Sequence, residues 1–333
     1  MNDNQRTKSA TATKSTKASK KLKGLDDLQK VFPAEQSCIK FLEKHLWKGK
    51  TPTSPFIPNG EVYKCADQVT KGKNPARYNR YKCKNTGKYF NIRTGTIFEG
   101  SNLPLKKWTL AFYVFGSDKR GISSYHLARY IGVTQKTAWF MLHRMRESFI
   151  NPLFKIMLKN VVETDEKFVG GKNKNRHENK KVPHFQGRSW KDKIVTWGAI
   201  ERGGNLIAQV VPNNKKKTLE PLVKQNVEIG SEVNSDEWLA YNGLGKWYNH
   251  QWVNHGAKQY VNGKVHTNTI EGSWSQLSGI INTYRHVSRK HAQRYINEFT
   301  FRYNTRNYSD WERFELMLSL AVDKRLTYGE LIS

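Results

Sequence analysis

The hydrophobic pattern divides the chain into a helix- and turn-rich first half and a strand-rich second half. Apolar residues recur at helical spacing over residues 25–47, where Pro33 separates two short helices. Over residues 53–98, Tyr and Phe alternate with Lys and Arg between turn residues, which predicts short strands with either a solvated or a nucleic-acid-binding face. Helical spacing returns over residues 103–149. We therefore expect helices combined with a small β-ribbon in the first half.

Two short helices joined by a Gly-Val-Thr turn are predicted inside the second helical region. Ser123 or Ser124 can cap a helix that ends at Gly132, and Thr134 can cap the next. This arrangement is typical of a helix-turn-helix, whose second helix enters the major groove of DNA. An ordinary helical hairpin is the alternative. The candidate DNA contacts on the second helix are Gln135, Lys136, His143 and Arg144.

The second half alternates between apolar runs of strand length and helical stretches. The predicted strands are Val161–Val169, Ile194–Ile200, Leu206–Val211, Gly230–Asn234 and part of His250–Val261. The predicted helices are Thr218–Asn226 and residues 269–306, and the basic stretch Lys172–Lys193 is predicted to be a loop. The order strand, strand, strand, helix, strand, helix, strand, helix is expected of a ribonuclease-H-like α/β fold. In that fold the first strand lies beside the fourth.

The charge of the chain indicates a polyanionic partner. Lys and Arg number 57 against 28 Asp and Glu, which gives a net charge of +29 and a pI of about 9.9. This surplus is typical of nucleic-acid binders, with a basic membrane-surface protein as the alternative. No apolar run reaches the roughly 18 residues of a membrane-spanning helix, and the N-terminus lacks the apolar segment of a secretory signal. Three cysteines without a CxxC pair fit a reducing compartment.

Three isolated carboxylates stand out on this basic chain. Asp165 lies in the first predicted strand, Asp236 follows the fourth, and Glu271 lies at the start of the last helical region. Phosphodiester cleavage builds negative charge on the attacking and leaving oxygens, which two Mg2+ ions can stabilise. Mg2+ prefers hard oxygen ligands. We expect Asp165 to bridge the two ions, with Asp236 on one and Glu271 on the other, and we expect Mn2+ to substitute.

The two aspartates have neighbouring acids that could take their place. Glu163 and Glu166 compete with Asp165, the former on the same face of the strand and the latter on the opposite face. Asp236 could instead cap a helix, and Glu237 is its rival. Taken singly, each of these acids has an ordinary structural explanation. Their joint placement in this strand order favours the metal site.

The start of the last helical region carries two further polar candidates. His266 and Asn268 lie within five residues of Glu271 and could orient a water or a metal ligand. Both are accessory catalytic candidates. The structural alternative is that Glu271 completes a capping box with Asn268 and that His266 only shapes the preceding turn.

Several short sequence pieces occur together in a defined order. They are Thr94-Gly95-Thr96-Ile97-Phe98, Leu103-Pro104-Leu105-Lys106-Lys107-Trp108, Glu163-Thr164-Asp165-Glu166, Ser235-Asp236, His266-Thr267-Asn268-Thr269-Ile270-Glu271-Gly272 and Phe299-x-x-Arg302-Tyr303-Asn304. With these pieces, residues 30–307 resemble bacterial insertion-sequence transposases of the ISXO-like group. These are relatives of the eukaryotic Merlin elements in the DDE superfamily.

The resemblance implies a transposition reaction on double-stranded DNA. Metal-activated water nicks the element ends at terminal inverted repeats, and the freed 3′-hydroxyl attacks target DNA. Asp165, Asp236 and Glu271 match the family's acidic triad; some relatives carry Asn with a nearby His in place of the third acid. We expect a homodimer or higher assembly, no membrane association, and a cytoplasmic, nucleoid-associated location in a bacterium or a nuclear one in a eukaryote. The alternatives are a catalytically idle DNA-binding regulator and a nuclease on RNA:DNA hybrids, which the large N-terminal segment disfavours.

The chain departs from the family pattern at the zinc ribbon that usually precedes the helix-turn-helix. Ser54-Pro55-Phe56-Ile57 stands where the first CxxC pair would be, and Cys83-Lys84-Asn85-Thr86 where the second would be. Only Cys83 remains of the four sulfur ligands that a structural zinc site needs. We therefore expect a ribbon without zinc, held by its aromatic residues.

These expectations give an α+β multidomain chain. Its predicted parts are a disordered basic arm (1–24), a zinc-ribbon-like DNA-binding domain (25–100), a helix-turn-helix (101–155), a ribonuclease-H-like catalytic domain (156–308) and a C-terminal helical tail (309–333).

Overall fold

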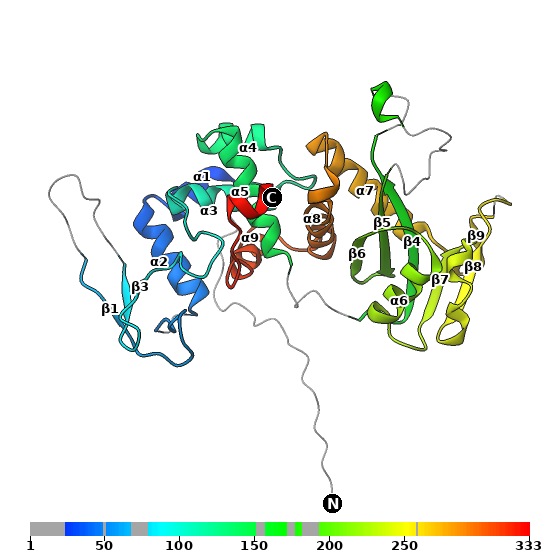
Figure 1. The fold of residues 1–333 in the computed structure, drawn as a ribbon, viewed down its shortest axis with the longest axis horizontal. Helices are drawn as coiled ribbons and strands as arrows, with labels where there is room; N and C mark the ends of the chain where they lie inside the picture. Colours follow the sequence, from blue (N-terminus) through cyan, green and yellow to red (C-terminus); the bar gives the residue numbers. More distant parts are fainter. Residues whose placement is uncertain are drawn as a thin grey trace, which may run out of the picture.

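The structure is a computed structural model that describes residues 24–48, 51–67, 79–150, 157–171, 177–181, 193–257 and 259–333. It combines helices with a small and a large β-sheet, so it is mixed α and β. The small sheet and the first helices lie at one end of Figure 1, and the large sheet lies at the other. The predicted basic arm lies outside the described residues apart from Gly24, and so does most of the predicted 172–193 loop.

The first elements follow the sequence pattern closely. Helices α1 (Leu25–Val31) and α2 (Glu35–Leu46) are separated at Pro33, as predicted. Strands β1 (Val62–Lys64), β2 (Tyr81–Cys83) and β3 (Tyr89–Phe90) form an antiparallel sheet in the order β1-β2-β3. Aromatic contacts hold this sheet, because the Tyr81 ring packs on Phe90 at 5.7 Å and on Trp47 at 5.0 Å between ring centroids.

Two of the three central helices begin at predicted cap residues, and one of these two ends at the predicted Gly132. Helix α3 spans Leu105–Ser117, α4 spans Ser124–Ile131 and α5 spans Gln135–Ser148. The Ser123 and Thr134 hydroxyls accept hydrogen bonds from the first turns of α4 and α5. Gly132 closes α4 with φ of 62°, a left-handed conformation that glycine adopts without a steric penalty.

The C-terminal residues return to the first half of the chain, where the C-terminus lies among its helices (Figure 1). Helix α9 (Asp310–Ser319) packs on α3, and α10 (Tyr328–Ile332) lies near α5. Phe314, Met317 and Leu318 are fully buried in the same hydrophobic core as Phe112. The last segment of the chain therefore completes the N-terminal core.

The large sheet contains five described strands in the order β6-β5-β4-β7-β8. Its strands are β4 (Val161–Val169), β5 (Ile194–Glu201), β6 (Leu206–Val211), β7 (Glu232–Asp236) and β8 (Asn249–Val253). β4, β5 and β6 are antiparallel neighbours, whereas β7 runs parallel to β4 and to β8. The first strand of this region thus lies beside the fourth, as predicted. Glu163 and Asn234 are register partners across that junction.

Helices cover both faces of this sheet. Helix α6 (Lys216–Asn226) packs on one face, and α7 (Asn268–Tyr284) and α8 (Ala292–Asn304) pack on the other. A short hairpin of β9 (Val261–Asn262) and β10 (Val265–His266) leads into α7. Between β7 and β8, where the predicted element order has a helix without assigned bounds, the structure has two 3-10 turns, Leu239–Tyr241 and Leu244–Lys246. No described helix is long and apolar enough to cross a membrane.

A buried ionic cluster joins the two halves of the molecule. The Glu298 carboxylate on α8 accepts hydrogen bonds from Arg146 Nε on α5 and Arg302 Nε on α8, both at 2.8 Å, and from the Tyr284 hydroxyl at 2.7 Å. Arg302 Nη2 also donates to the Phe115 carbonyl of α3. Burial alone would raise the pKa of Glu298, but the charges of Arg146 and Arg302 outweigh it and lower that pKa. The cluster therefore fixes α5 against the helices that cover the large sheet.

Candidate active site

The sheet register places two of the predicted acids side by side. Asp165 lies two residues beyond Glu163 on β4, and Asp236 lies two residues beyond Asn234 on β7. Because Glu163 and Asn234 are partners in parallel strands and side chains alternate with a period of two, Asp165 and Asp236 occupy matching positions on one face. That face is the one covered by α7, since the Trp274 indole of α7 donates to Asp165.

The third acid reaches the same place from the first turn of α7. The helix is preceded by Thr267, so Asn268 is its first residue and the alternative capping box with Asn268 does not form. Glu271 Oε1 instead accepts a hydrogen bond from the Thr267 hydroxyl at 3.0 Å and lies 3.7 Å from His255 Nε2. The Glu271 side chain is 45% exposed, so it remains accessible to a ligand.

Asp165, Asp236 and Glu271 line one cavity of about 550 Å³. The other residues that line it are Glu166, Lys167, Phe168, Lys193, His255, Tyr260 and Trp274. Polar and charged groups dominate, and two lysines lie beside the acids. The cavity can therefore bind an anion and a cation together, as a phosphate with its counter-ion would require.

The electrostatics of the cavity centre on Asp165. Its pKa is raised to about 6, first by burial and then by the negative charge of Asp236, with a smaller contribution from Glu271. Hydrogen bonds from the Glu166 backbone N–H and the Trp274 indole act in the opposite direction. The negative charge of Asp236 thus disfavours the ionised form of Asp165, and a bound cation would relieve this repulsion.

The carboxylate oxygens of the three acids are of the type that a hard cation prefers, although the acids are not already grouped as a complete set of metal ligands. Among the residues that the structure describes, no three or more His, Cys, Asp or Glu side chains already form a group that could hold a metal ion. The acids line a shared cavity from three separate elements, and Glu271 is half-exposed. Carboxylate oxygens are the ligands that Mg2+ prefers, and it usually keeps several waters. The three acids therefore offer the type of donor that a divalent ion takes.

A glycine on the neighbouring strand makes room for the Trp274 ring. Gly198 is the register partner of Asp165 on β5. A Cβ at this position would lie 2.6 Å from the Trp274 ring carbon Cη2 and 2.9 Å from Cζ2. Real Cβ atoms do not approach ring carbons so closely, so Gly198 is required for Trp274 to reach Asp165.

Replacing Gly198 by Ala should therefore displace Trp274 and break its hydrogen bond to Asp165. We expect a destabilisation of about 1–3 kcal/mol, the usual cost of overpacking a core, and a changed near-UV circular dichroism signal. Gly245→Ala is the matched control, because its added Cβ would meet no atom within 4 Å. Equal unfolding midpoints for the two variants would contradict this account.

The rival acids have other partners. Glu166 also lines the cavity, but its carboxylate accepts a hydrogen bond from the Tyr241 hydroxyl on the α6 face of the sheet. Glu237 accepts hydrogen bonds from the backbone N–H groups of His255 and Gly256, and so fixes the loop that carries His255. Asp236 Oδ1 accepts from the Trp238 N–H in a turn rather than capping an α-helix.

The two accessory candidates lie outside the cavity. His266 ends β10, and its Nδ1 lies 3.2 Å from the buried Glu163 carboxylate. Asn268 is exposed at the first position of α7. Neither is among the described residues that line the cavity. The structure therefore brings three of the five predicted catalytic residues together and leaves His266 and Asn268 beside them.

The sequence analysis did not single out five residues that line the cavity: Trp274, His255, Tyr260, Lys167 and Lys193. Trp274 follows Glu271 by three residues, so helical spacing could have placed both on one face of α7. Tyr260 and His255 lie on the segment between β8 and β9, and their rings pack at 5.3 Å between centroids. No local pattern in the sequence marks them.

The predicted DNA contacts on α5 are only partly accessible. Lys136 is exposed, with its ammonium 4.8 Å from the Tyr328 ring, and Gln135 donates to the Ser124 hydroxyl. His143 and Arg144 are buried, which corrects their prediction as DNA contacts.

His143 and Arg144 are buried because α5 is covered on two sides. Arg144 donates to the carbonyls of Glu99 and Leu326, so the C-terminal segment covers one side. The His143 ring packs against Trp139 and His291, so the approach to α8 covers another. A helix that was expected to expose its second half to DNA instead buries it between the two halves of the molecule.

Burial of His143 predicts a pH-dependent stability. Burial lowers its pKa to about 2, assisted by the positive charge of Arg146 and by His291 and Arg294. In the unfolded chain the pKa of His is about 6.5, so below that pH only the unfolded state takes up the proton and folding is weakened. We expect wild type to lose up to about 1.4 kcal/mol per pH unit more than His143→Phe as the pH falls below about 6.

Urea unfolding at several pH values measures this difference. His126→Phe, at an exposed position on α4, is the matched control and should keep the wild-type pH profile. A wild-type profile that runs parallel to that of His143→Phe would contradict the burial of a neutral imidazole.

The small sheet (β1-β2-β3) and the segment before it form the predicted ribbon. They bring together residues 54–57 and 83–86, the two segments in which the family would carry cysteine pairs. The pKa of the Cys83 thiol is lowered by hydrogen bonds from the Ser54 and Thr86 hydroxyls. Hydroxyl groups thus surround the remaining sulfur. The absence of zinc stays a prediction, which metal analysis of the purified protein checks; one zinc per chain would contradict it.

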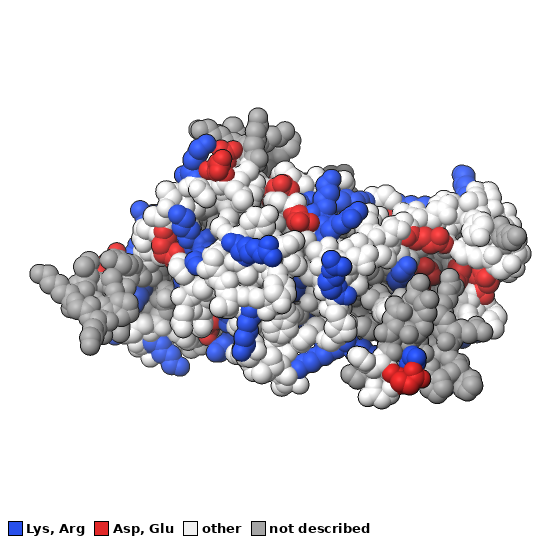
Figure 2. All heavy atoms as spheres, turned by 90° about the horizontal axis from the view of Figure 1, so that it is seen from above, with Lys and Arg blue, Asp and Glu red and all other residues white. Residues whose placement is uncertain are grey.

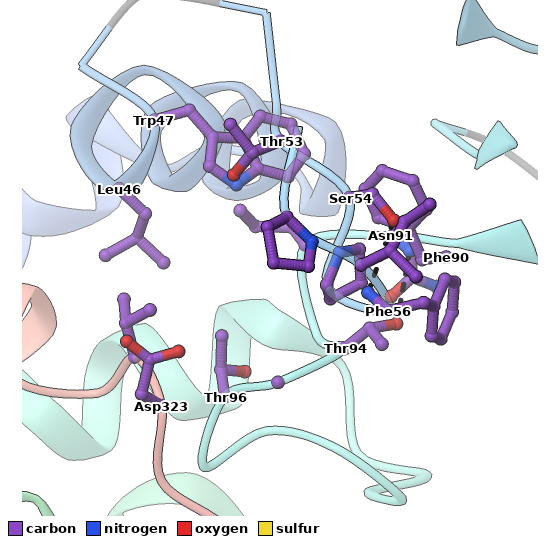
Figure 3. Close-up of a pocket in the computed structure, with 16 residues that line it drawn as sticks. Leu46, Trp47, Thr53, Ser54, Phe56, Phe90, Asn91, Thr94, Thr96 and Asp323 are labelled. Atoms are coloured by element: carbon purple, nitrogen blue, oxygen red, sulfur yellow. Dashed lines mark hydrogen bonds between the residues drawn. The ribbon is translucent and has the colours of Figure 1, made fainter. Parts of the chain in front are cut away.

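A second cavity of about 500 Å³ lies between this ribbon, α2 and the C-terminal segment (Figure 3). Trp47 lines it from the end of α2, Phe56 from the segment before β1, and Asp323 from the C-terminal segment. Among its described lining residues, Asp323 is the one with an ionisable side chain. This cavity therefore lacks the grouped carboxylates and lysines of the first one.

Positively charged side chains are distributed along the length of the molecule. Figure 2 shows Lys and Arg side chains spread along the face seen from above, with smaller groups of Asp and Glu between them. On the small sheet, the exposed Tyr89 ring lies 5.2 Å from the Arg80 guanidinium and 5.3 Å from the Lys82 ammonium. Aromatic rings beside cations are suited to contacts with nucleic acids.

Comparisons with known proteins connect the chain with transposable elements. Residues 157–304, from shortly before β4 to the end of α8, match the family model described as the ISXO2-like transposase domain. Over 283 residues the chain is 26% identical to an uncharacterized protein in transposable element ISH50 of Halobacterium salinarum, covering 82% of this chain and 92% of that protein. An uncharacterized transposase-like protein of Haemophilus influenzae is 23% identical over 124 residues, covering 37% and 94% respectively. These matches support an insertion-sequence transposase.

Proposed function

We propose that this protein is a DNA transposase that binds the terminal inverted repeats of an insertion sequence, cleaves at the element ends and joins the 3′-hydroxyl ends to target DNA. The observation that carries the proposal is the meeting of Asp165, Asp236 and Glu271 in one cavity. They come from β4, β7 and α7, three elements separated in sequence. The match to the ISXO2-like transposase domain supplies the class of reaction.

The fold proposed for residues 157–304 is ribonuclease-H-like. The sheet order β6-β5-β4-β7-β8 supports it, because the first strand of the region is central and the fourth runs parallel beside it. Helices on both faces complete a three-layer arrangement. The relationship to the ISXO-like and Merlin elements within the DDE superfamily belongs to the same proposal.

The chain supplies the oxygen ligands and the surrounding charges. Asp165, Asp236 and Glu271 would hold the Mg2+ ions, since all three carboxylates line the same cavity. When bound, the ions would stabilise negative charge on the attacking and leaving oxygens and lower the pKa of the attacking water or hydroxyl. Trp274 orients the Asp165 carboxylate through its indole N–H. Lys167 and Lys193 provide positive charge for the DNA phosphates.

The DNA-binding part of the proposal rests on the first half of the chain. Helices α4 and α5 would act as a helix-turn-helix through Gln135 and Lys136 in the first turn of α5. The small sheet would add contacts through Tyr89 and its neighbouring cations. A homodimer or larger assembly at the paired ends, in the cytoplasm of a bacterium, completes the proposal, because two ends must be joined in one event.

A cleavage assay tests the proposal. The purified full chain is incubated with DNA that carries an element end, with Mg2+, with Mn2+ or with EDTA. We expect nicked and joined products with either metal and none with EDTA. Binding to end-containing DNA without cleavage in either metal would favour the alternative, a catalytically idle regulator derived from a transposase.

A further inference from the structure

The buried carboxylate of Glu163 joins the central strand to the first turn of α7. Glu163 lies on β4, two residues before Asp165, and is completely buried. Its Oε2 accepts hydrogen bonds from the backbone N–H groups of Thr269 at 2.8 Å and Ile270 at 3.0 Å. Its Oε1 accepts one from the Thr269 hydroxyl at 2.9 Å. The side chain of the strand thus satisfies N–H groups that would otherwise have no partner within the helix.

The same carboxylate fixes the chain that leads into α7. Arg202 Nε donates to Glu163 Oε1 at 2.6 Å. The remaining guanidinium nitrogens of Arg202 donate to the carbonyls of Lys264 at 2.8 Å and His266 at 3.0 Å. The His266 ring also lies against Glu163. One buried acid and one arginine therefore hold both the segment before the helix and the helix start.

We propose that Glu163 is a positioning residue that holds the start of α7 so that Glu271 faces Asp165 and Asp236. Glu271 follows Ile270 directly, so the backbone that carries it is fixed within one residue of the Glu163 hydrogen bonds. Asp165 is on the same strand as Glu163, so one rigid strand carries both the positioning acid and a cavity acid. The proposal rests on the proposed metal site and adds the device that sets its geometry.

The chemistry of the contacts makes a carboxylate necessary. The five groups around Glu163 are the Thr269 N–H and hydroxyl, the Ile270 N–H, the Arg202 Nε–H and the His266 ring, and the first four donate to it. A carboxylate has two oxygens that accept and no hydrogen to donate, whereas an amide would turn an NH2 group against these donors. Glu163→Gln should therefore loosen the start of α7 although its size is unchanged.

Hydrogen–deuterium exchange of the full chain tests the anchoring without any metal. In Glu163→Gln, the amides of residues 269–272 should exchange faster than in wild type, while those of α8 should not. The matched control is Glu312→Gln. Glu312 also accepts a hydrogen bond at the start of a helix, from the Ser309 N–H of α9, but this helix is not the one that carries Glu271. That control should leave residues 269–272 at the wild-type exchange rate.

Terbium binding tests the consequence for the site. Tb3+ prefers oxygen ligands, and its luminescence is sensitised by a nearby tryptophan, here Trp274 beside Asp165. We expect Glu163→Gln to weaken Tb3+ binding by about 10- to 100-fold, the usual effect of losing a group that orients metal ligands. Mg2+ should displace Tb3+ from the wild type, and binding to end-containing DNA without metal should be unchanged.

The outcomes separate this inference from the proposed function. Unchanged exchange at residues 269–272, or faster exchange with unchanged Tb3+ affinity, would overturn the positioning role. Wild type that fails to bind Tb3+ in the cavity would overturn the proposed metal site, while the exchange measurement would still decide whether Glu163 anchors α7. If Glu163→Gln does not fold, Glu163→Asp replaces it, because it keeps the charge but is too short to reach all of the donors.

Discussion

Asp165→Asn should abolish metal-dependent cleavage and joining while leaving DNA binding intact. Asn keeps the shape of the side chain but removes the negative charge that Asp165 would contribute to the proposed metal site. Stabilisation of the charged transition state by bound metal is worth several kcal/mol, so we expect a loss on the order of 10³-fold or more. Gel-based cleavage assays at saturating Mg2+ measure the rate, and mobility shifts measure binding.

Stability controls make this result interpretable. Because the pKa of Asp165 is raised by burial and by Asp236, removing its charge should stabilise the metal-free fold or leave it unchanged. Asp310→Asn, at a half-exposed carboxylate paired with Arg313, is the matched control and should retain activity. Cleavage by Asp165→Asn at the wild-type rate would refute the assignment of this acid.

Glu298→Gln should produce the largest loss of stability among single substitutions of buried acids. The change leaves Arg146 and Arg302 buried beside a neutral amide. Removing one partner of a buried ion pair costs about 3–5 kcal/mol, because the remaining charge is uncompensated. The rings of Tyr295 and Tyr284 face the Arg146 guanidinium at 4.1 and 4.6 Å, and they stabilise it only in part. Urea unfolding measures the free energy.

An exposed ion pair provides the comparison for this prediction. Glu61 pairs with Lys84 at the surface of the small sheet, and both side chains are more than half exposed. Glu61→Gln should leave the unfolding midpoint unchanged, since exposed pairs contribute little. If Glu298→Gln and Glu61→Gln unfold at the same urea concentration, the buried cluster does not join the two halves as described.

The cluster also explains part of the family-like tail of the sequence. Arg302 belongs to the buried ionic group, and Asn304 makes two hydrogen bonds with the backbone of Leu206 at the edge of the large sheet. Both residues were recognised as part of a motif, but the sequence offered no role for either. Their roles are structural, because they attach α8 to the N-terminal helices on one side and to β6 on the other.

The sequence by itself determined the local elements and singled out the three candidate acids. Cap residues, Pro33 and the Gly-Val-Thr turn fixed the helices, because these signals act through neighbouring backbone groups. The apolar runs placed the strands of the large sheet. Their order is the one expected of a ribonuclease-H-like fold, and that fold predicted that β4 and β7 are neighbours. Asp165, Asp236 and Glu271 could be chosen because few acids stand in strand or helix-start positions on so basic a chain.

Only the tertiary structure decided which side chains share an environment. Glu163 and Asp165 lie on the same face of β4, and no pattern shows that one caps α7 while the other faces a cavity. His143 and Arg144 read as a DNA-binding surface until the C-terminal segment and the approach to α8 are seen to cover them. The reason is physical: burial and pairing depend on segments more than a hundred residues away, and sequence spacing does not report such contacts.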